Sequence, residues 1–384
     1  MPDLTIEELD PAMAVTHPES GLLWYDLLDL GLEGQGWGDL AHPYDRLPAR
    51  AEGRVTEAVW TLSHCTAGIG ARLVTDATEI AARWTIRGER LAMDHMPATG
   101  MSGIDLYARW EEAWRWLGIG RAVNLPDNET KLVAGMAPGE REYRVYLPLY
   151  NGVDAVKIGV PQGARVCRVG GSAGGATGET PVVPGTAGAG VQIPPPFREG
   201  GRGVGAVVFY GTSITQGGCA SRPGMVHTSI LGRWLDVPVI NLGFSGNGRM
   251  EPVMGELLAE LDPAAYVLEC LPNLSPEEAE ERVEPFVVNL RAARPETPIV
   301  LVESITYQNA YLVTAGQERY GRQNRYLREL YARLAPGDPR LHYLEGAGLL
   351  GEDGEGTVDG VHATDLGFLR IAEGMVEGLR KALG

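Results

Sequence analysis

The sequence predicts a two-part protein in which an all-β sandwich precedes a three-layer α/β domain. Its 384 residues are more than a single hydrophobic core comfortably serves. Short runs of β-branched and aromatic residues dominate before residue 200, whereas strand-like and helix-like runs alternate after it. A stretch rich in glycine and proline separates the two patterns.

The separating stretch contains glycine-rich segments at 170–178 and 200–203 and a proline-rich segment at 191–196. Such composition is typical of loops and linkers. We therefore place the domain boundary near residue 200. This predicts a β domain at 1–200, with the linker at its end, and an α/β domain at 201–384.

The first half contains short candidate strands, most of them separated by Gly, Pro, Asn or Asp. These runs are 55–62, 80–86, 143–149 and 155–160. Residues 141–147 largely alternate polar and apolar side chains, as expected of a strand with one face in water. Residues 105–117 are ambiguous and could form short helices. A jelly-roll-like β-sandwich is the expected architecture.

The second half alternates between buried strands and longer helices. Strands are expected at 204–209, 237–242, 265–270, 299–303 and 341–344, and helices at 224–235, 252–261, 276–293, 317–334 and 365–383. Repeated β-α units favour parallel pairing with right-handed crossovers. We therefore expect a parallel sheet with helices on both faces.

Composition argues against several functional classes. The net charge of −17 leaves no basic excess for binding nucleic acid. No apolar segment approaches the length of about 18 residues that a membrane span needs, and residues 1–8 lack the pattern of a secretory signal. We therefore expect a cytoplasmic protein without a membrane partner. The four cysteines and seven histidines show no metal-ligand spacing, so neither a metal nor another cofactor is expected.

Ser213 follows the first apolar run of the second half, directly after Gly211 and Thr212. This position presents a side chain at the carboxyl edge of a parallel sheet, where ligands bind. Much later, Asp359 and His362 lie three positions apart. A serine nucleophile needs a base, and a histidine oriented by a carboxylate is a suitable one. Each residue alone also has an ordinary explanation, as a helix cap or a loop residue.

The ends of the next two strands carry groups that suit an oxyanion hole. Gly243 lies in a segment with three glycines at 241–248, and Asn273 follows the third strand. Backbone N–H groups and amide side chains are typical donors to an oxyanion. Taken singly, a turn glycine and a helix-capping asparagine are the simpler interpretations.

In this order, the segments resemble those of the SGNH hydrolase superfamily, also called GDSL-type lipases and esterases. The resemblance covers residues 203–384. It implies a flavodoxin-like α/β/α fold with Ser213 as nucleophile, His362 as base and Asp359 as its partner. It also implies an oxyanion hole formed by Ser213, Gly243 and Asn273.

Two segments depart from the pattern of that superfamily. Thr212 stands where an aspartate usually precedes the serine, and the third segment, usually Gly-x-Asn-Asp, reads Leu271-Pro272-Asn273-Leu274. The first change affects a local hydrogen bond. The second leaves Asn273 in place but alters the pocket wall.

Residues 103–107 read Gly-Ile-Asp-Leu-Tyr. This segment resembles the Gly-x-Asp-Leu-Tyr motif of a β-sandwich domain that precedes the catalytic domain in one branch of the superfamily. Residues 146–152 fit the same branch. The resemblance therefore extends over nearly the whole chain.

Three further residues are candidates for substrate binding. His227 lies on the helix after the nucleophile, and it is either a hydrogen-bonded or surface histidine or a substrate-pocket residue. Arg222 and Arg249 follow the two glycine-rich turns and could bind a polar or anionic substrate. Solvated surface arginines are the alternative interpretation.

The chemistry expected is serine-dependent acyl transfer through an acyl-Ser213 intermediate, with a small-molecule acyl donor and a hydroxylated acceptor as partners. An O-acyltransferase or esterase acting on a hydroxylated natural product fits this chemistry. Its sharpest version is salicylyl transfer to a tetracycline-type polyketide. The alternatives are a carbohydrate acetylesterase and a non-catalytic binding module. The oligomeric state is left open.

Overall fold

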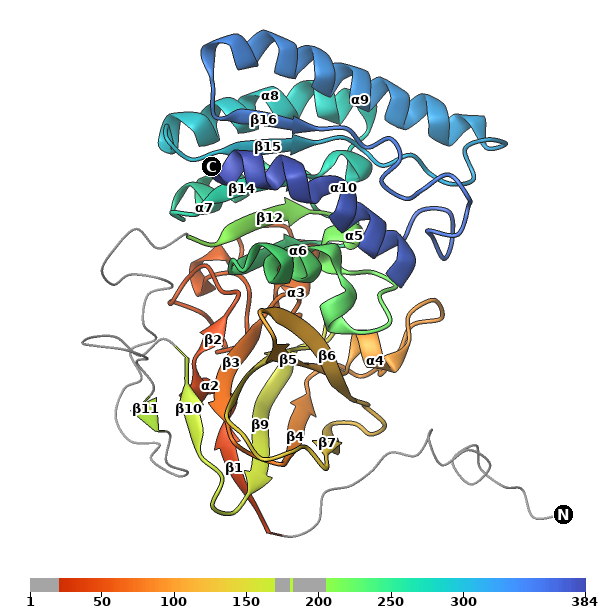
Figure 1. Ribbon diagram of the computed structural model, residues 1–384. Coiled ribbons are helices and arrows are strands. Elements are labelled where there is room, and N and C mark those ends of the chain that lie inside the picture. The colour runs from red at the N-terminus through yellow and green to blue at the C-terminus, as the bar shows by residue number, and fades with distance from the viewer. Residues whose placement is uncertain (1–20, 170–179, 182–204) are drawn as a thin grey trace, which may run out of the picture.

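The computed structural model describes residues 21–169, 180–181 and 205–384. Figure 1 shows an antiparallel β domain in the lower part of the view and an α/β domain above it. The predicted linker segments and the boundary near residue 200 lie outside the described residues, as does the start of the strand expected at 204–209.

The N-terminal domain consists of two antiparallel sheets, which confirms the predicted β-sandwich. One sheet has the order β1 (Leu22–Asp26), β9 (Val153–Pro161), β4 (Glu79–Ile86) and β7 (Asp127–Ala134). The other has the order β11 (Thr180–Pro181), β10 (Val166–Arg168), β3 (Gly70–Thr75), β8 (Arg141–Tyr146), β5 (Ile104–Trp110) and β6 (Ala113–Gly120), with β2 (Leu32–Glu33) beside β3. Leu73, Trp84 and Val145 belong to one buried cluster, so the core lies between the sheets.

Two segments of this domain differ from the prediction. Residues 55–62, expected as a strand, contain α3 (Glu57–Ser63), whose N-cap Thr56 accepts a hydrogen bond from Val59 N. Apolar residues at 55, 59 and 62 recur with helical spacing, which outweighs the β-branched composition. Residues 105–117, considered as short helices, form most of the β5–β6 hairpin instead. The shorter helices of this domain are α2 (Leu27–Leu30), α4 (Ala98–Met101) and the 3-10 turn η2 (Ala49–Ala51).

The C-terminal domain contains a five-stranded parallel sheet. Its order is β13 (Val239–Gly243), β12 (Val207–Gly211), β14 (Ala265–Glu269), β15 (Ile299–Val302) and β16 (Leu341–Leu344), which is the flavodoxin-like order. The helices are α5 (Ser213–Gln216), α6 (His227–Leu235), α7 (Pro252–Ala259), α8 (Pro276–Ala293), α9 (Thr314–Leu334) and α10 (Asp365–Leu383), with 3-10 turns η3 (Pro223–Met225), η4 (Leu271–Asn273) and η5 (Ala335–Gly337). No helix among the described residues has the length and apolar content needed to cross a bilayer.

Helices cover both faces of this sheet, which confirms the predicted three layers. Alternate residues of a strand face opposite sides. On β12, Val208 and Tyr210 pack in a cluster with residues of α7, α8 and α9. Val207 and Phe209 pack in a second cluster with residues of α6 and α10. The N-terminal domain adds side chains to both clusters, including Trp37 in the first.

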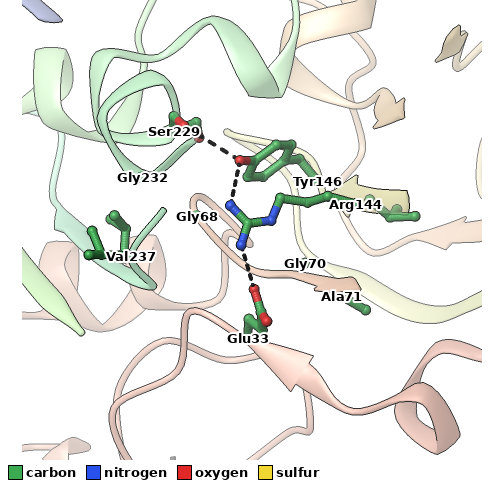
Figure 2. A pocket seen from close by; sticks show the side chains of 11 residues that line it. Glu33, Gly68, Gly70, Ala71, Arg144, Tyr146, Ser229, Gly232 and Val237 are labelled. Carbon is green, nitrogen blue, oxygen red and sulfur yellow. Dashed lines mark hydrogen bonds and ion pairs between the residues drawn. The ribbon is translucent and has the colours of Figure 1, made fainter. Parts of the chain in front are cut away.

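A small cavity of about 20 Å³ lies between the domains (Figure 2). Arg144 donates to Glu33 Oε2 at 3.2 Å and to Tyr146 Oη at 3.4 Å, and Tyr146 donates to the Ser229 carbonyl at 3.5 Å. The volume admits about one water molecule. None of the lining residues belongs to the predicted site, so this cavity is a feature of the interface.

Candidate active site

Three strand ends lie level with one another at the carboxyl edge of the parallel sheet. Gly211, the last residue of β12, pairs with Gly243 of β13 on one side and with Glu269 of β14 on the other. The segments that follow these strands therefore start from the same edge, where open α/β sheets bind their ligands. These are the segments in which the sequence predicts catalytic groups.

Ser213 is the first residue of α5 and is only 9% exposed. Thr212 caps this helix: its hydroxyl accepts from Ile214 N at 3.3 Å, and its own N–H donates to Thr215 Oγ1 at 3.1 Å. This reciprocal capping fixes the turn that presents the serine. Threonine is thus able to hold the turn at the position where aspartate is usual.

Ser213, His362 and Asp359 form a hydrogen-bonded chain. Ser213 Oγ lies 2.9 Å from His362 Nε2, and His362 Nδ1 lies 2.7 Å from Asp359 Oδ2. With the Nδ1 proton donated to the carboxylate, Nε2 accepts from the serine hydroxyl. This is the arrangement in which a histidine acts as base toward a serine.

The loop before α10 orients the carboxylate of Asp359. Its Oδ1 accepts from His362 N at 2.8 Å and from Val361 N at 3.0 Å. Burial alone would raise the pKa of Asp359, but these N–H donors and the His362 ring outweigh it and lower the pKa below its usual value. The side chains of His362 and Asp359 are 25% and 39% exposed, so solvent reaches this side of the site.

Glu269, which the sequence analysis did not single out, supports the cap of α5. Its Oε2 accepts from Thr215 Oγ1 at 2.9 Å, and His227 Nε2 lies 3.2 Å from both carboxylate oxygens. His227 is fully buried and stacks on Phe368 with ring centroids 5.9 Å apart. It is therefore a buried, hydrogen-bonded histidine and does not line a substrate pocket. A glutamate at the end of a buried strand was the signal that could have identified Glu269.

Gly243 does not have the free N–H group that the sequence analysis expected. It donates to Asn241 Oδ1 at 2.9 Å, so this group is not available to an oxyanion. A Cβ atom at position 243 would lie 2.1 Å from Gln216 N. Glycine is required here because β13 approaches α5 closely.

The turn after β13 offers a different donor. Gly246 has φ +71°, a left-handed conformation that favours glycine, and its N–H has no hydrogen-bond partner among the described residues. Ser213, as the first helical residue, has no intrahelical acceptor for its N–H. Gly246 thus replaces Gly243 as the candidate oxyanion donor.

Asn273 ends η4, directly after β14. Its amide oxygen accepts from Asn247 N at 3.0 Å and from Gly248 N at 3.1 Å in the orientation that satisfies both donors. The amide NH₂ then points away from these two N–H groups. Asn273 therefore connects the turns after β13 and β14 and keeps a donor for a ligand.

The two arginines considered as substrate ligands lie in different surroundings. Arg222 Nη1 donates to Asp105 Oδ2 at 2.8 Å and to Tyr107 Oη at 2.5 Å, so the N-terminal domain holds this guanidinium. Arg249 donates to the Gly246 carbonyl at 3.0 Å, and its side chain is 44% exposed. Only Arg249 keeps the accessibility that a substrate ligand needs.

The Gly-x-Asp-Leu-Tyr segment forms part of the contact between the domains. Asp105 is fully buried and, besides the Arg222 guanidinium, it accepts from Gly224 N at 2.9 Å and from Trp116 Nε1 at 2.7 Å. The Tyr107 ring packs so closely on Gly224 that a Cβ there would lie 2.4 Å from it. The motif therefore holds the segment after the nucleophile helix.

Arg46 makes a second contact from the N-terminal domain. It is 1% exposed, and its Nη1 donates to the carbonyls of Asn241 at 3.1 Å and Gly243 at 2.7 Å. Nε and Nη2 donate to the carbonyls of Cys65 at 2.8 Å and Leu62 at 2.6 Å. One buried guanidinium thus ties the end of β13 to the β domain.

His95 and Cys219, which sequence spacing did not indicate, lie beside His362. The ring centroids of His95 and His362 are 5.8 Å apart. One potential ligand atom from each of the three residues lies within 4.8 Å of the other two. The residues come from three separate segments, so only the tertiary structure brings them together.

Two family models match the chain. Residues 205–380 match the GDSL-like lipase/acylhydrolase family, and residues 22–166 match GxDLY, the N-terminus of SGNH-hydrolase-type esterases. No curated protein matches the sequence significantly.

Solved structures share the whole two-domain arrangement. A protein described as a GDSL-like lipase from Bacteroides ovatus is 29% identical, with a TM-score of 0.81 over 94% of this chain and 98% of that one. The salicylyl-acyltransferase SsfX3 from a tetracycline biosynthetic pathway is 16% identical, with a TM-score of 0.71 over 95% and 98%. A family two carbohydrate esterase from Cellvibrio japonicus is 12% identical, with a TM-score of 0.51 over 94% and 98%. At 16% and 12% identity, the likeness to SsfX3 and to the carbohydrate esterase shows a shared fold.

Proposed function

We propose that this enzyme cleaves a carboxylic ester through an acyl-Ser213 intermediate, because residues 205–380 match the GDSL-like lipase/acylhydrolase family. The observation that carries the proposal is the chain of contacts from Ser213 through His362 to Asp359, at 2.9 and 2.7 Å. The family implies a small-molecule ester as substrate, and these contacts supply a nucleophile and its base.

In the first step, Ser213 Oγ attacks the ester carbonyl while His362 Nε2 takes the hydroxyl proton. The carbonyl oxygen becomes an oxyanion, which we assign to the N–H groups of Ser213 and Gly246 and the amide of Asn273. The ester bond then breaks, and the leaving alcohol receives the proton from His362. Asp359 keeps the ring oriented and stabilises its positive charge.

In the second step, His362 Nε2 takes a proton from an acceptor, which attacks the acyl-serine carbonyl. The bond to Ser213 Oγ then breaks, and His362 returns the proton to the serine. We propose water as the main acceptor because the His362 and Asp359 side chains are open to solvent. A transferase must exclude water from this step and hold an alcohol instead. The open side of the site therefore favours hydrolysis.

Two finer versions of the function come from the named chemistry of structural neighbours. SsfX3 is a salicylyl-acyltransferase, which supports salicylyl transfer to a hydroxylated polyketide as one version. The carbohydrate esterase supports deacetylation of a sugar as the other. Both neighbours share the fold of this chain. The two versions of the function differ in the acyl group and in the acceptor.

The test is release of p-nitrophenol from its acetyl and salicyl esters by wild type, Ser213→Ala and Ser229→Ala. We expect Ser213→Ala to lower turnover by several orders of magnitude. Ser229, buried on α6 outside the site, provides the matched control and should leave the rate unchanged. Equal rates in wild type and Ser213→Ala would contradict the proposal.

Assays with added alcohol acceptors and with acetylated sugars distinguish the possible substrates. Acceleration by an alcohol, with ester formation, would favour the transferase version over hydrolysis. Faster cleavage of the salicyl ester supports an aromatic acyl group. Rapid acetate release from acetylated xylose or mannose supports the carbohydrate version instead.

A further inference from the structure

We propose that His95, Cys219 and His362 form a binding site for Zn²⁺ and that the bound ion reversibly inhibits the enzyme. The metal-binding part depends only on the geometry of the three side chains. The inhibition rests on the proposed function of His362 as the base.

The three side chains provide a donor set that zinc prefers. Two imidazoles and a thiolate are typical zinc ligands, held about 2.0–2.3 Å from the ion in tetrahedral sites. Their nearest ligand atoms already lie within 4.8 Å of one another. Closing to tetrahedral spacing requires shifts of roughly 1 Å, which side-chain rotation supplies. His95 is exposed, so its ring is free to make most of this movement.

His362 already has the outer-shell partner of a metal-bound histidine. Its Nδ1 is held by Asp359 Oδ2 at 2.7 Å, and the carboxylate also accepts the His362 backbone N–H. A carboxylate on the far nitrogen fixes the tautomer and increases the basicity of a metal-binding imidazole. The lone pair of Nε2, which now faces Ser213, is then the one offered to the ion.

Cys219 is held beside the base by an unusual backbone. It is buried and has φ +74°, a conformation that non-glycine residues rarely adopt. The preceding Gly218 packs against the ring of His362, where a Cβ would lie 3.4 Å from Cδ2. Burial, with a contribution from the charge of Asp359, raises the pKa of the Cys219 thiol to about 12.

Zinc reverses the electrostatic preference at Cys219. The thiol is protonated in the metal-free enzyme, and coordination releases that proton to solvent as the Zn–S bond forms. The nearby negative charge of Asp359, which disfavours the thiolate alone, favours a dication. While Nε2 is coordinated, it cannot accept the Ser213 proton, so attack on the ester stops until the ion leaves.

The test titrates metal-free, full-length enzyme with ZnCl₂ and, for spectroscopy, with CoCl₂. We expect one Zn²⁺ per chain to abolish ester hydrolysis and a chelator to restore it. Co²⁺ should give a near-ultraviolet thiolate-to-cobalt absorption, which reports a Co–S bond without requiring activity.

Three variants separate this site from adventitious binding. Cys219→Ser and His95→Ala should keep the metal-free rate within about twofold, yet need at least tenfold more Zn²⁺ for inhibition, because even the loss of an outer-shell partner costs about 10- to 100-fold in affinity. Cys219→Gly removes the thiol and suits the positive φ, so it serves if the serine variant folds poorly. Cys219 variants should lose the thiolate-to-cobalt absorption.

Two results would overturn the proposal. One is equal zinc sensitivity in wild type and the variants, since the ion then binds elsewhere. The other is an unchanged cobalt spectrum in Cys219→Ser. If the enzyme proved inactive on every ester, the cobalt absorption would still decide whether the metal site exists.

Discussion

Replacement of Arg46 by methionine should weaken the fold and slow catalysis together. The buried guanidinium donates to four carbonyl oxygens, two in the β domain and two at the end of β13. Each such bond is worth about 1 kcal/mol net. The four bonds together are worth about 4 kcal/mol. Methionine recovers part of this because no charge is then buried. Burial of the charged guanidinium is unfavourable, and it lowers the pKa of Arg46 to about 10. We expect a net loss of about 3 kcal/mol.

The catalytic effect follows from which carbonyls are released. Those of Asn241 and Gly243 precede the turn that contains Gly246, and Arg46 also lies over the Phe244 ring at 4.9 Å. Loss of one oxyanion donor costs about 10²- to 10³-fold in kcat, and a donor that is displaced but still present should cost less, so we expect a decrease of about 10- to 100-fold. KM should change little because the turn acts on the transition state.

Urea unfolding and steady-state ester hydrolysis measure the two effects. Arg54→Met is the matched control: Arg54 also reaches across the domains, to Glu256 at 2.7 Å, but both side chains are exposed. That exposed pair should be worth less than about 1 kcal/mol. Arg46→Met with unchanged stability would refute the energetic reasoning. Loss of stability with an unchanged kcat would refute a role in holding the turn.

Thr215→Val removes a buried hydroxyl that accepts from Thr212 N and donates to Glu269, so kcat should fall about tenfold and the free energy of unfolding by about 2 kcal/mol; an unchanged kcat counts against this link. Asp105→Asn removes the buried carboxylate that faces the partly exposed Arg222 guanidinium, and thermal unfolding should show a loss of about 1.5–3 kcal/mol, whereas a near-zero effect contradicts a stabilising pair. The pKa of Asp359 is lower in the folded than in the unfolded state, so its stabilising contribution is complete above about pH 4 and disappears as pH falls through the folded value. The stability difference between wild type and Asp359→Asn should therefore shrink below about pH 4 and stay constant at neutral pH.

The catalytic half of the fold could be predicted closely because its local signals agree. Continuous apolar runs and long periodic helices alternate there, and α8 begins at Pro276 and ends at Ala293, as the sequence indicates. In the β domain, residues 55–62 carry conflicting signals: β-branched residues suggest a strand, while Thr56 and the apolar spacing favour a helix. The capping interaction decides this case, and composition alone does not reveal it.

The site was predictable where residues act through their position in the chain. Strand ends and short spacings single out Ser213, Asp359 and His362, which the structure brings within hydrogen-bond distance of one another. For Gly243, the sequence shows that a glycine is present but not where its N–H points. Contacts that depend on tertiary structure, such as those of His95 and Cys219 with His362, leave no local pattern in the sequence.

The contact between the two domains has a consequence for folding during synthesis. Every described strand of the β domain precedes β12, so Arg46 and Asp105 have left the ribosome before any strand of the catalytic sheet exists. Domains generally fold as units during synthesis, the N-terminal one first. The sandwich can therefore present a finished surface to the emerging catalytic half. Its surface would then be a template on which the turns after β12 and β13 fold, so the β domain would assist folding of the catalytic half.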